Sequence, residues 1–550
     1  MRAPSARRLR AGSLPDLAIA ALLLAALACA RSDRPARAAG PAPELWLWYG
    51  VNLADPPSIA RLESVWRRAA AAGYRHVMLS DPKFSRLDRM DAGYFENVAR
   101  VKALASSLGI EIVPGLFTVG RANVMLEHDP NLVEGLPVRN AAFEVRGGVA
   151  HPLTDPPVAL PSRPAFADGE VRIDNGVATV RENGAHARFR FTVTVAPWRC
   201  YHVSVLIRTA GFTGAPLIQV LADGRAIHFV KSLGVQSTQD WTRHDLVFNS
   251  LGYDHVDLWF GAWKPAHGTL EWKDWRIEEP GFFNLVRRAS APLTVTGYAP
   301  SPALAGPESY LEGRDFDPIS DPALGRSPSP GEYRGWHEPP LLRAHLPDGT
   351  RLRASWTEAA VVYDRQVACC LSDSGTMSRL ADESARMRRA WGAGGYLMMH
   401  DEIRVLGRDD ACLRRGLTPG QILAADARDC ARLLAGSRVY VWNDMFDPFQ
   451  NAVKDYHLVG GDLAGSWEGL DSSVVIVNWN GDRKDESLRF FADRGHHQII
   501  AGYYDGRVED IRGWLDSAAR VPGVTGVMYT TWRDRYDDLE AFAKAVREYR

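Results

Sequence analysis

Short apolar runs alternate with amphipathic helical stretches in two long parts of this chain, and this alternation restricts the fold more than any other feature. The runs lie at residues 45–51, 76–80 and 110–116, and again at 396–400, 438–442, 474–479, 498–503 and 525–531. Repeated strand–helix units predict a parallel sheet covered by helices. Eight such units in order predict a closed (β/α)8 TIM barrel, in which the reacting groups lie at the carboxyl ends of the strands.

The long segment between the third and fourth runs follows a different pattern. Over residues 165–280 the apolar residues alternate with polar ones, as at Val203, Val205 and Ile207. Alternation of period two predicts half-buried antiparallel strands. We therefore expect an inserted antiparallel β-sandwich, jelly-roll-like in form, between strands three and four of the barrel.

These patterns divide the 550 residues into six segments. They are an export signal at 1–30, a linker at 31–43, the first part of the barrel at 44–160, the sandwich at 165–280, a stretch of loops, a hairpin around Pro347-Asp348-Gly349 and a helix at 281–394, and the second part of the barrel at 395–550.

The first thirty residues are typical of a secretory signal. Several arginines precede an apolar run at 17–28, which is too short to span a membrane comfortably. We expect an exported protein, periplasmic or extracellular, with no membrane span. Cys29 loosely fits a lipoprotein acceptor pattern, so a lipid anchor at this residue stays open.

Charge and cysteine usage exclude several classes of protein. The chain has 65 Lys plus Arg and 66 Asp plus Glu, and it therefore lacks the basic field that nucleic acid requires. Phosphate-binding glycine loops, HExxH and CxxC pairs are absent from the sequence, so we expect no cofactor and no metal. Five cysteines follow the signal, and an odd number at irregular spacing does not indicate a disulfide framework, although Cys412 and Cys430 could pair in an oxidising compartment.

The strongest local signal for chemistry is the end of the fourth predicted strand. There, an apolar run ends in His400, Asp401 and Glu402. Two carboxylates held close together raise the proton affinity of one of them, which is what a general acid near neutral pH needs. We expect Asp401 and Glu402 to be catalytic. His400 is expected to be a buried histidine that supports an acid or the substrate.

Aromatic and polar side chains follow the other late strands. The candidates for substrate binding are Trp442 and Asp444 after strand five, Trp479 after strand six, Tyr503 and Tyr504 after strand seven, and Trp532 after strand eight. Apolar walls with a few convergent polar groups describe a ligand pocket. Polar residues after strands two and three, including Arg121, could also reach it.

In this part of the chain, residues 395–532, the sequence resembles the family-20 β-N-acetylhexosaminidases. In that family an Asp-Glu pair ends strand four, a Trp followed closely by an acid ends strand five, a Tyr follows strand seven and a Trp follows strand eight. This chain differs in having Met399 and His400 where the family has a Gly or small residue, and in lacking an equivalent of the family's first-strand Arg.

The resemblance implies a retaining, substrate-assisted mechanism in which the substrate's own 2-acetamido oxygen attacks the anomeric carbon. Glu402 would protonate the leaving oxygen, and Asp401 would hold the acetamido N–H. Tyr503 or Tyr504 would donate a hydrogen bond to the amide oxygen, and Asp444 would accept one from a sugar hydroxyl. The acetamido methyl group would be walled by Trp442, Trp479 and Trp532.

Two alternatives remain open. A glycosidase could use a second protein carboxylate, Asp444 or Asp505, as nucleophile or base. The chain could also be a non-catalytic exported protein that binds polysaccharide. In either case the partner is an oligosaccharide or polysaccharide, and the sandwich, which contains five tryptophans between residues 241 and 275, resembles carbohydrate-binding modules.

Overall fold

The computed structural model describes residues 43–298, 309–363 and 365–549. The predicted export signal, Cys29 and all of the predicted linker except Pro43 lie outside the described residues. Within the described ranges, no helix has the length and apolar character needed to cross a bilayer.

Eight parallel strands form a closed barrel, which confirms the predicted fold class. In order around the barrel they are β1 (Glu44–Gly50), β2 (His76–Ser80), β3 (Glu111–Leu116), β21 (Gly395–Met398), β22 (Arg438–Trp442), β23 (Val475–Asn478), β24 (Gln498–Ile500) and β25 (Val524–Tyr529). Strand β25 pairs with β1 and closes the ring.

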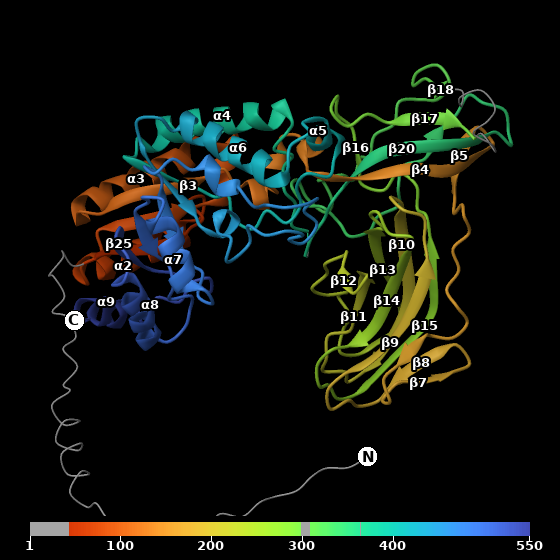
Figure 1. The fold of residues 1–550 in the computed structure, drawn as a ribbon, viewed down its shortest axis with the longest axis horizontal. Helices are drawn as coiled ribbons and strands as arrows, with labels where there is room; N and C mark the ends of the chain where they lie inside the picture. Colours follow the sequence, from red (N-terminus) through yellow and green to blue (C-terminus); the bar gives the residue numbers. More distant parts are fainter. Residues whose placement is uncertain (1–42, 299–308, 364, 550) are drawn as a thin grey trace, which may run out of the picture. The chain divides into compact units, whose positions relative to one another are not determined.

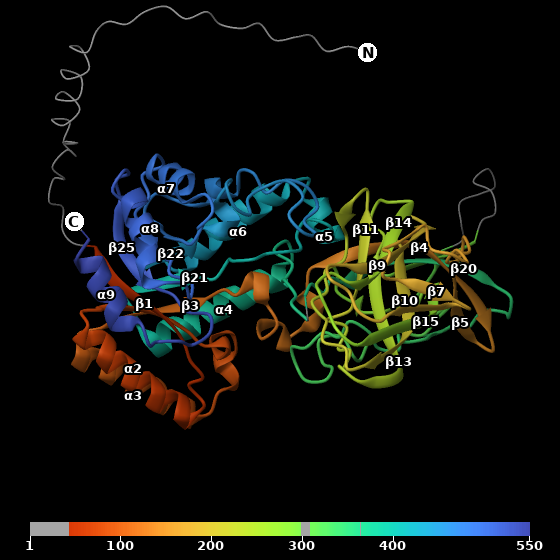
Figure 2. The same ribbon diagram turned by 90° about the horizontal axis from the view of Figure 1, so that it is seen from below.

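Helices surround this barrel (Figures 1 and 2). They are α2 (Pro56–Ala71), α3 (Ala92–Leu108), α4 (Ser374–Trp391), α6 (Pro419–Leu433), α7 (Lys484–Ala492), α8 (Ile511–Ala518) and α9 (Leu539–Arg547). Local sequence sets their ends: Thr418 and Gln421 form a capping box at the start of α6, and Gly109, with φ of 64°, ends α3. Between β22 and β23 the helix is replaced by two 3-10 turns, η5 (Asp444–Phe446) and η6 (Ser466–Gly469).

Side chains alternate across the barrel wall. Leu47 and Tyr49 of β1 face the helices, whereas Trp46 and Trp48 belong to the core inside the barrel. Each large ring buried in this way stabilises the fold by roughly 1.5–3 kcal/mol. The same alternation, continued past the strand ends, decides which residues reach the mouth of the barrel.

The inserted β-sandwich is present between β3 and α4, as predicted (Figure 1). One sheet contains β13 (Gln239–Asn249), β10 (Cys200–Ala210), β15 (Thr269–Glu278), β8 (Val177–Val180) and β7 (Arg172–Asp174). The other contains β12 (Arg225–Ala226), β11 (Leu217–Ala222), β14 (His255–Ala262), β9 (Ala187–Thr194) and β6 (Phe166–Ala167). Phe189 and Phe260 stack between the sheets with ring centroids 5.3 Å apart, and both contact the buried Trp272.

A third, antiparallel sheet was not predicted. Its strands are β18 (Ser309–Tyr310), β17 (Thr294–Gly297), β20 (Arg351–Ala359), β4 (Gly135–Arg146), β5 (Val149–Leu153) and β19 (Leu342–Arg343), with β16 (Leu285–Val286) paired to β20. The predicted hairpin around residues 347–349 is wrong, because β19 pairs with β5 while β20 pairs with β4 and β17. The turn residues are present, but both flanking strands bond to more distant partners.

The five cysteines after the signal are free and buried. Cys412 lies next to Cys370, with 4.0 Å between the sulfurs. Cys430 contacts Asp426 on its own helix instead. The structure therefore does not join Cys412 to Cys430.

Candidate active site

The segment that follows β21 carries the predicted acids to the mouth of the barrel. Leu397 faces the barrel interior, and two residues later Met399 packs against the same core. Asp401, two residues further, lines a pocket together with Met399. His400 points the opposite way, into the layer between barrel and helices, where its Nε2 lies 2.9 Å from Asp426 of α6.

The pocket has a volume of about 410 Å³, within the range usual for small-molecule sites. Its walls combine one cation, two acids, a thioether and four aromatic rings. They are Arg121, Met399, Asp401, Glu402, Trp442, Trp479, Tyr504 and Trp532.

Glu402 is held by two guanidinium groups. One of its oxygens forms an ion pair with Arg121, and the other lies 2.7 Å from Arg404. Its backbone has φ of 51°, an unusual left-handed conformation for a glutamate. The backbone N–H of Glu402 donates to Oδ2 of Asp444 at 2.9 Å, which secures this turn.

Asp401 lies beside Glu402 on the same wall and is equally exposed, at 21% of its side chain. Burial raises the pKa of its carboxyl and the charge of Glu402 raises it further, while the guanidinium of Arg121 lowers it. The Arg121 Nε lies 4.0 Å from the Asp401 carboxylate. The pocket thus contains two neighbouring acids in unequal surroundings, which is the arrangement that separates an acid role from an orienting role.

Asp444 lies behind the acids and not in the pocket. It is fully buried, and its Oδ2 also accepts a hydrogen bond from Asn451 at 2.9 Å. Burial and the nearby Asp401 raise the pKa of Asp444 to about 8. The structure therefore gives Asp444 a positioning role toward the Glu402 backbone, in place of the expected contact with a sugar hydroxyl.

The aromatic walls form two connected groups. Trp479 and Tyr504 stack with ring centroids 6.0 Å apart, and Trp442 contacts Trp532 at 6.0 Å. Behind them Trp48 packs against Trp442 at 5.3 Å and Trp532 at 5.6 Å. Trp532 and Tyr504 remain 47% and 53% exposed, so flat apolar faces are available to a ligand.

The loop after β3 lies close against the loop that carries Asp401 and Glu402, which we call the acid loop. A Cβ placed on Gly120 would meet the carbonyl oxygen of Asp401 at 2.2 Å, so only glycine allows this approach. Gln366, from the end of the insertion, donates to the carbonyl oxygens of Gly120 and Glu402 at 2.8 and 3.2 Å. The insertion therefore helps to order the acids and presents Arg121 beside them.

Two further sequence predictions need correction at this site. His400 is buried as expected and contacts an acid, Asp426, but it lies behind the pocket and does not reach a substrate there. Tyr503 packs against Tyr529 and Phe542 and donates to Asp538 at 2.9 Å. It faces the helices because β24 ends at Ile500, before the predicted end, and alternation does not continue through the following turn.

Asp505, considered as a second carboxylate, also has a structural role. It accepts hydrogen bonds from the backbone N–H of Trp532 at 2.7 Å and from the Thr531 hydroxyl at 2.5 Å. Neither Asp505 nor Asp444 is among the residues that line the pocket. Of the remaining candidates, the structure brings Asp401, Glu402, Trp442, Trp479, Tyr504 and Trp532 together.

Sequence reasoning gave no role to Arg121 and did not include Met399. Arg121 could be named only as one of several polar residues after strand three, because an ion pair between residues so distant in the chain leaves no local pattern. The position of Met399 did have a signal, since it lies two residues from both Leu397 and Asp401 on one side of the strand.

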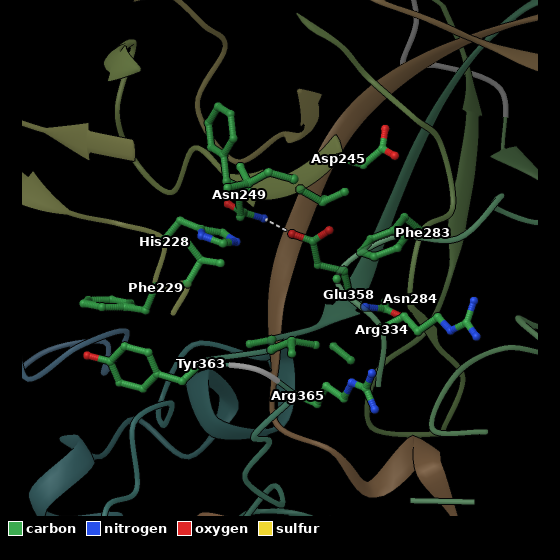
Figure 3. A pocket seen from close by; sticks show the side chains of 18 of the residues that line it. His228, Phe229, Asp245, Asn249, Phe283, Asn284, Arg334, Glu358, Tyr363 and Arg365 are labelled. Carbon is green, nitrogen blue, oxygen red and sulfur yellow. Dashed lines mark hydrogen bonds between the residues drawn. The ribbon is translucent and has the colours of Figure 1, made fainter. Parts of the chain in front are cut away.

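A larger cavity of about 510 Å³ lies elsewhere, between β13 of the sandwich and the end of β20 (Figure 3). Its central acid is Glu358, which accepts a hydrogen bond from Asn249 at 2.8 Å and whose pKa burial raises to about 7. The other acid among its described lining residues, Asp245, is bonded to His202 and Arg243. Because the described lining of this cavity contains no two adjacent acids, we place the candidate chemistry in the smaller pocket.

No protein-family model matches the chain, and no curated protein matches it. Solved structures similar to it include a β-N-acetylhexosaminidase, at 9% identity over 92% of this chain and 71% of that one, with a TM-score of 0.38. A rhamnosidase from Novosphingobium sp. PP1Y is 13% identical over 92% of this chain, which spans 58% of the rhamnosidase, with a TM-score of 0.31.

A carbohydrate-binding module of the CBM4 type is 13% identical over 20% of this chain and 77% of the module, with a TM-score of 0.17. With identities below 25% and TM-scores below 0.5, these likenesses carry no inference about chemistry.

Proposed function

We propose that the chain is a glycoside hydrolase that takes a terminal sugar ring into the pocket formed by Asp401, Glu402 and the surrounding aromatic rings. One observation carries the proposal. Two adjacent acids project into an aromatic-walled cavity at the carboxyl ends of the barrel strands, where the reacting groups of such barrels lie. Flat rings suit the apolar faces of a pyranose, and the acids suit its glycosidic oxygen and substituents.

In this proposal the mechanism is substrate-assisted, and the preferred substrate bears a 2-acetamido group. The pocket supports this choice because the acids among its described lining residues are two neighbours on one loop. The 2-acetamido oxygen forms the new bond to the anomeric carbon as the bond to the leaving oxygen breaks. Glu402 protonates the leaving oxygen, and Asp401 holds the acetamido N–H and stabilises the positive charge that develops.

Glu402 must reach the leaving oxygen to act on it, and its ion pair with Arg121 occupies one of its two oxygens. Arg121 is 57% exposed, so its side chain has room to turn away when a sugar enters. Arg404 is only 12% exposed and stays beside Glu402 to orient it. In this proposal, substrate binding therefore displaces Arg121 from Glu402 and leaves Arg404 in place.

Aryl glycosides with and without the acetamido group test this mechanism. The release of p-nitrophenol from the N-acetyl-β-glucosaminide is expected to exceed that from the β-glucoside by at least about 100-fold, because only the first substrate supplies its own nucleophile. In Asp401→Asn this preference should fall, since the amide cannot stabilise positive charge. Equal cleavage of both substrates by the parent chain would reject substrate assistance.

A second candidate function is carbohydrate binding without turnover. The observation that favours it is the pairing of Glu402 with both Arg121 and Arg404, which occupies both of its side-chain oxygens. A chain that releases no aryl group from a broad panel, and whose Glu402→Gln variant binds glycans as tightly as the parent, would support this second function.

A further inference from the structure

A second cluster of reactive side chains lies outside the pocket. Glu134, Cys370, Asp409 and Cys412 come together from three distant parts of the chain, and each offers one ligand atom within 4.8 Å of the others. All four are buried, with exposed fractions of 0–1%. None of them lines the acid pocket.

The spacing of these atoms fits a tetrahedral metal site. In a zinc tetrahedron with Zn–S about 2.3 Å and Zn–O about 2.0 Å, two sulfurs lie about 3.8 Å apart and a sulfur and an oxygen about 3.5 Å apart. The Cys370 and Cys412 sulfurs are 4.0 Å apart. The Cys412 sulfur lies 3.5 and 3.6 Å from the two Glu134 oxygens. At 4.0 Å the sulfurs are too far apart for a disulfide bond, which needs about 2.05 Å.

Glu134 is the member of the cluster whose burial is hardest to explain without a cation. Among the described residues, no Lys or Arg nitrogen lies within the 4.0 Å limit of an ion pair with it. Its side-chain oxygens are contacted by the Cys412 and Cys370 thiols, which are weak donors, and by the Arg408 backbone N–H at 3.4 Å. A buried carboxylate with so few donors costs several kcal/mol unless a charge compensates it.

The nearby cation Arg288 does not resolve this imbalance. It is already paired with Asp409, and its Nε lies 3.4 Å from Asp373. The single positive charge of Arg288 therefore already faces two carboxylates, those of Asp409 and Asp373. Glu134 and the two thiols are not included in this comparison. A divalent cation placed among the ligand atoms would offset the remaining negative charge.

We propose that Glu134, Cys370, Asp409 and Cys412 bind one zinc ion as a structural site. Two thiolates together with two carboxylates suit Zn²⁺ and not Ca²⁺ or Mg²⁺, which take oxygen ligands. Four protein ligands leave no open position for water, as in structural and not catalytic zinc sites. On binding, the two thiols form Zn–S bonds and release their protons to solvent.

A zinc ion bound at this site would link three segments that are far apart in the chain. Glu134 immediately precedes β4, and Cys370 lies before α4. Asp409 and Cys412 belong to the start of α5 (Asp410–Arg414), which follows the loop that carries Asp401 and Glu402. Zinc would thereby stabilise the return of the chain from the insertion to the barrel, whether or not the chain is a glycosidase.

Metal analysis and cobalt substitution test the proposal on the full chain, purified under reducing conditions. The purified protein is expected to contain roughly one zinc ion per chain. After removal by a chelator, added Co²⁺ should give the strong near-ultraviolet thiolate-to-cobalt band and the visible bands of tetrahedral cobalt. The chelator should also lower the melting temperature, and added Zn²⁺ should restore it.

Cys370→Ser and Cys412→Ser should each weaken the thiolate-to-cobalt band, because one thiolate remains, and the double variant should lose it. Cys200→Ser is the matched control, because Cys200 is also a buried free thiol, beside Glu358, but has no second thiol near it among the described residues. If a serine variant fails to fold, Glu134→Gln keeps the side-chain volume and should weaken Co²⁺ binding by at least about tenfold.

The proposal is overturned if reduced, folded protein contains no zinc and gives no thiolate-to-cobalt band at excess Co²⁺. It is also overturned if the band persists in the double variant Cys370→Ser/Cys412→Ser, or if Cys200→Ser loses it equally. A Cys370–Cys412 disulfide found by peptide mapping of protein purified without reductant would also overturn the proposal, because the two sulfurs would then be bonded to each other and not to a metal.

Discussion

Arg121 forms an ion pair with Glu402 across the mouth of the acid pocket, and its Nε lies 4.0 Å from the Asp401 carboxylate. One guanidinium thus faces both acids. It comes from the loop after β3, directly after Gly120, which touches the Asp401 backbone. The positive charge that faces both acids therefore comes from Arg121, in the loop after the neighbouring strand β3.

Replacement of Arg121 should change the pH dependence of activity. The guanidinium lowers the pKa of Asp401 against the effect of burial, so Arg121→Ala should raise that pKa further. If ionised Asp401 holds the acetamido group, the acidic limb of the kcat/KM profile should move to higher pH. Arg365→Ala is the control, because Arg365 pairs with Glu332 and not with the acids. An unmoved acidic limb in Arg121→Ala would contradict this assignment.

Asp444 should make the protein less stable as the pH rises. Its pKa is about 8 in the folded state and about 3.9 in an unfolded chain. Between these values the folded state keeps a proton that the unfolded state releases, so stability falls from about pH 4 to about pH 8 and then levels off. Asp444→Asn removes this dependence. Its melting temperature relative to the parent should increase across that pH range, and a constant difference would argue against a protonated Asp444.

Gly120 should tolerate no side chain. A methyl group there would meet the Asp401 carbonyl oxygen at 2.2 Å and push the acid loop away. We expect Gly120→Ala to destabilise the fold by about 1–3 kcal/mol and to lower kcat/KM roughly 100-fold. Gly50→Ala is the control, since Gly50 is the last residue of the barrel strand β1 and has open space around it. Equal kinetics for the two variants would show that this contact does not position the acids.

Two pocket tryptophans should behave differently when truncated. Trp532 is 47% exposed, so Trp532→Ala should leave the melting temperature nearly unchanged and raise KM roughly fivefold through the loss of about 1 kcal/mol of stacking. Trp442 is buried at 2% exposure, and Trp442→Ala should cost about 3–5 kcal/mol of stability. Thermal unfolding and steady-state kinetics on both variants check this contrast. An unchanged KM in a folded Trp532→Ala would remove Trp532 from the binding surface.

The barrel and the acid pocket could be predicted from the sequence, whereas the third sheet could not. The apolar run that ends in Asp401 and Glu402 identifies strand four, because such a run is buried and its acids must lie where the strand leaves the core. The third sheet depends on strands of only two residues, such as β16 and β19, which are too short to show a period. Its long strands, β4 and β20, are far apart in the chain and pair with each other.

Within the site, the wrong and missing predictions have a similar cause, because they depend on contacts between distant segments or on turns that interrupt a strand. The position of His400 could have been inferred, because alternation places it opposite Met399 and Asp401. The position of Tyr503 could not, since the turn after β24 interrupts alternation. The cluster of Glu134, Cys370, Asp409 and Cys412 was missed because its ligands come from three segments and form no spacing motif.

Proton donation from Glu402 to the leaving oxygen is the step on which the proposed hydrolysis depends. It can be measured as kcat/KM for aryl N-acetyl-β-glucosaminides whose leaving phenols span a range of acidity, in the parent chain and in Glu402→Gln. The variant should nearly match the parent on the most acidic phenol and fall at least about 100-fold below it on the least acidic one. A loss that is the same for every phenol, or no loss at all, would show that Glu402 is not the proton donor.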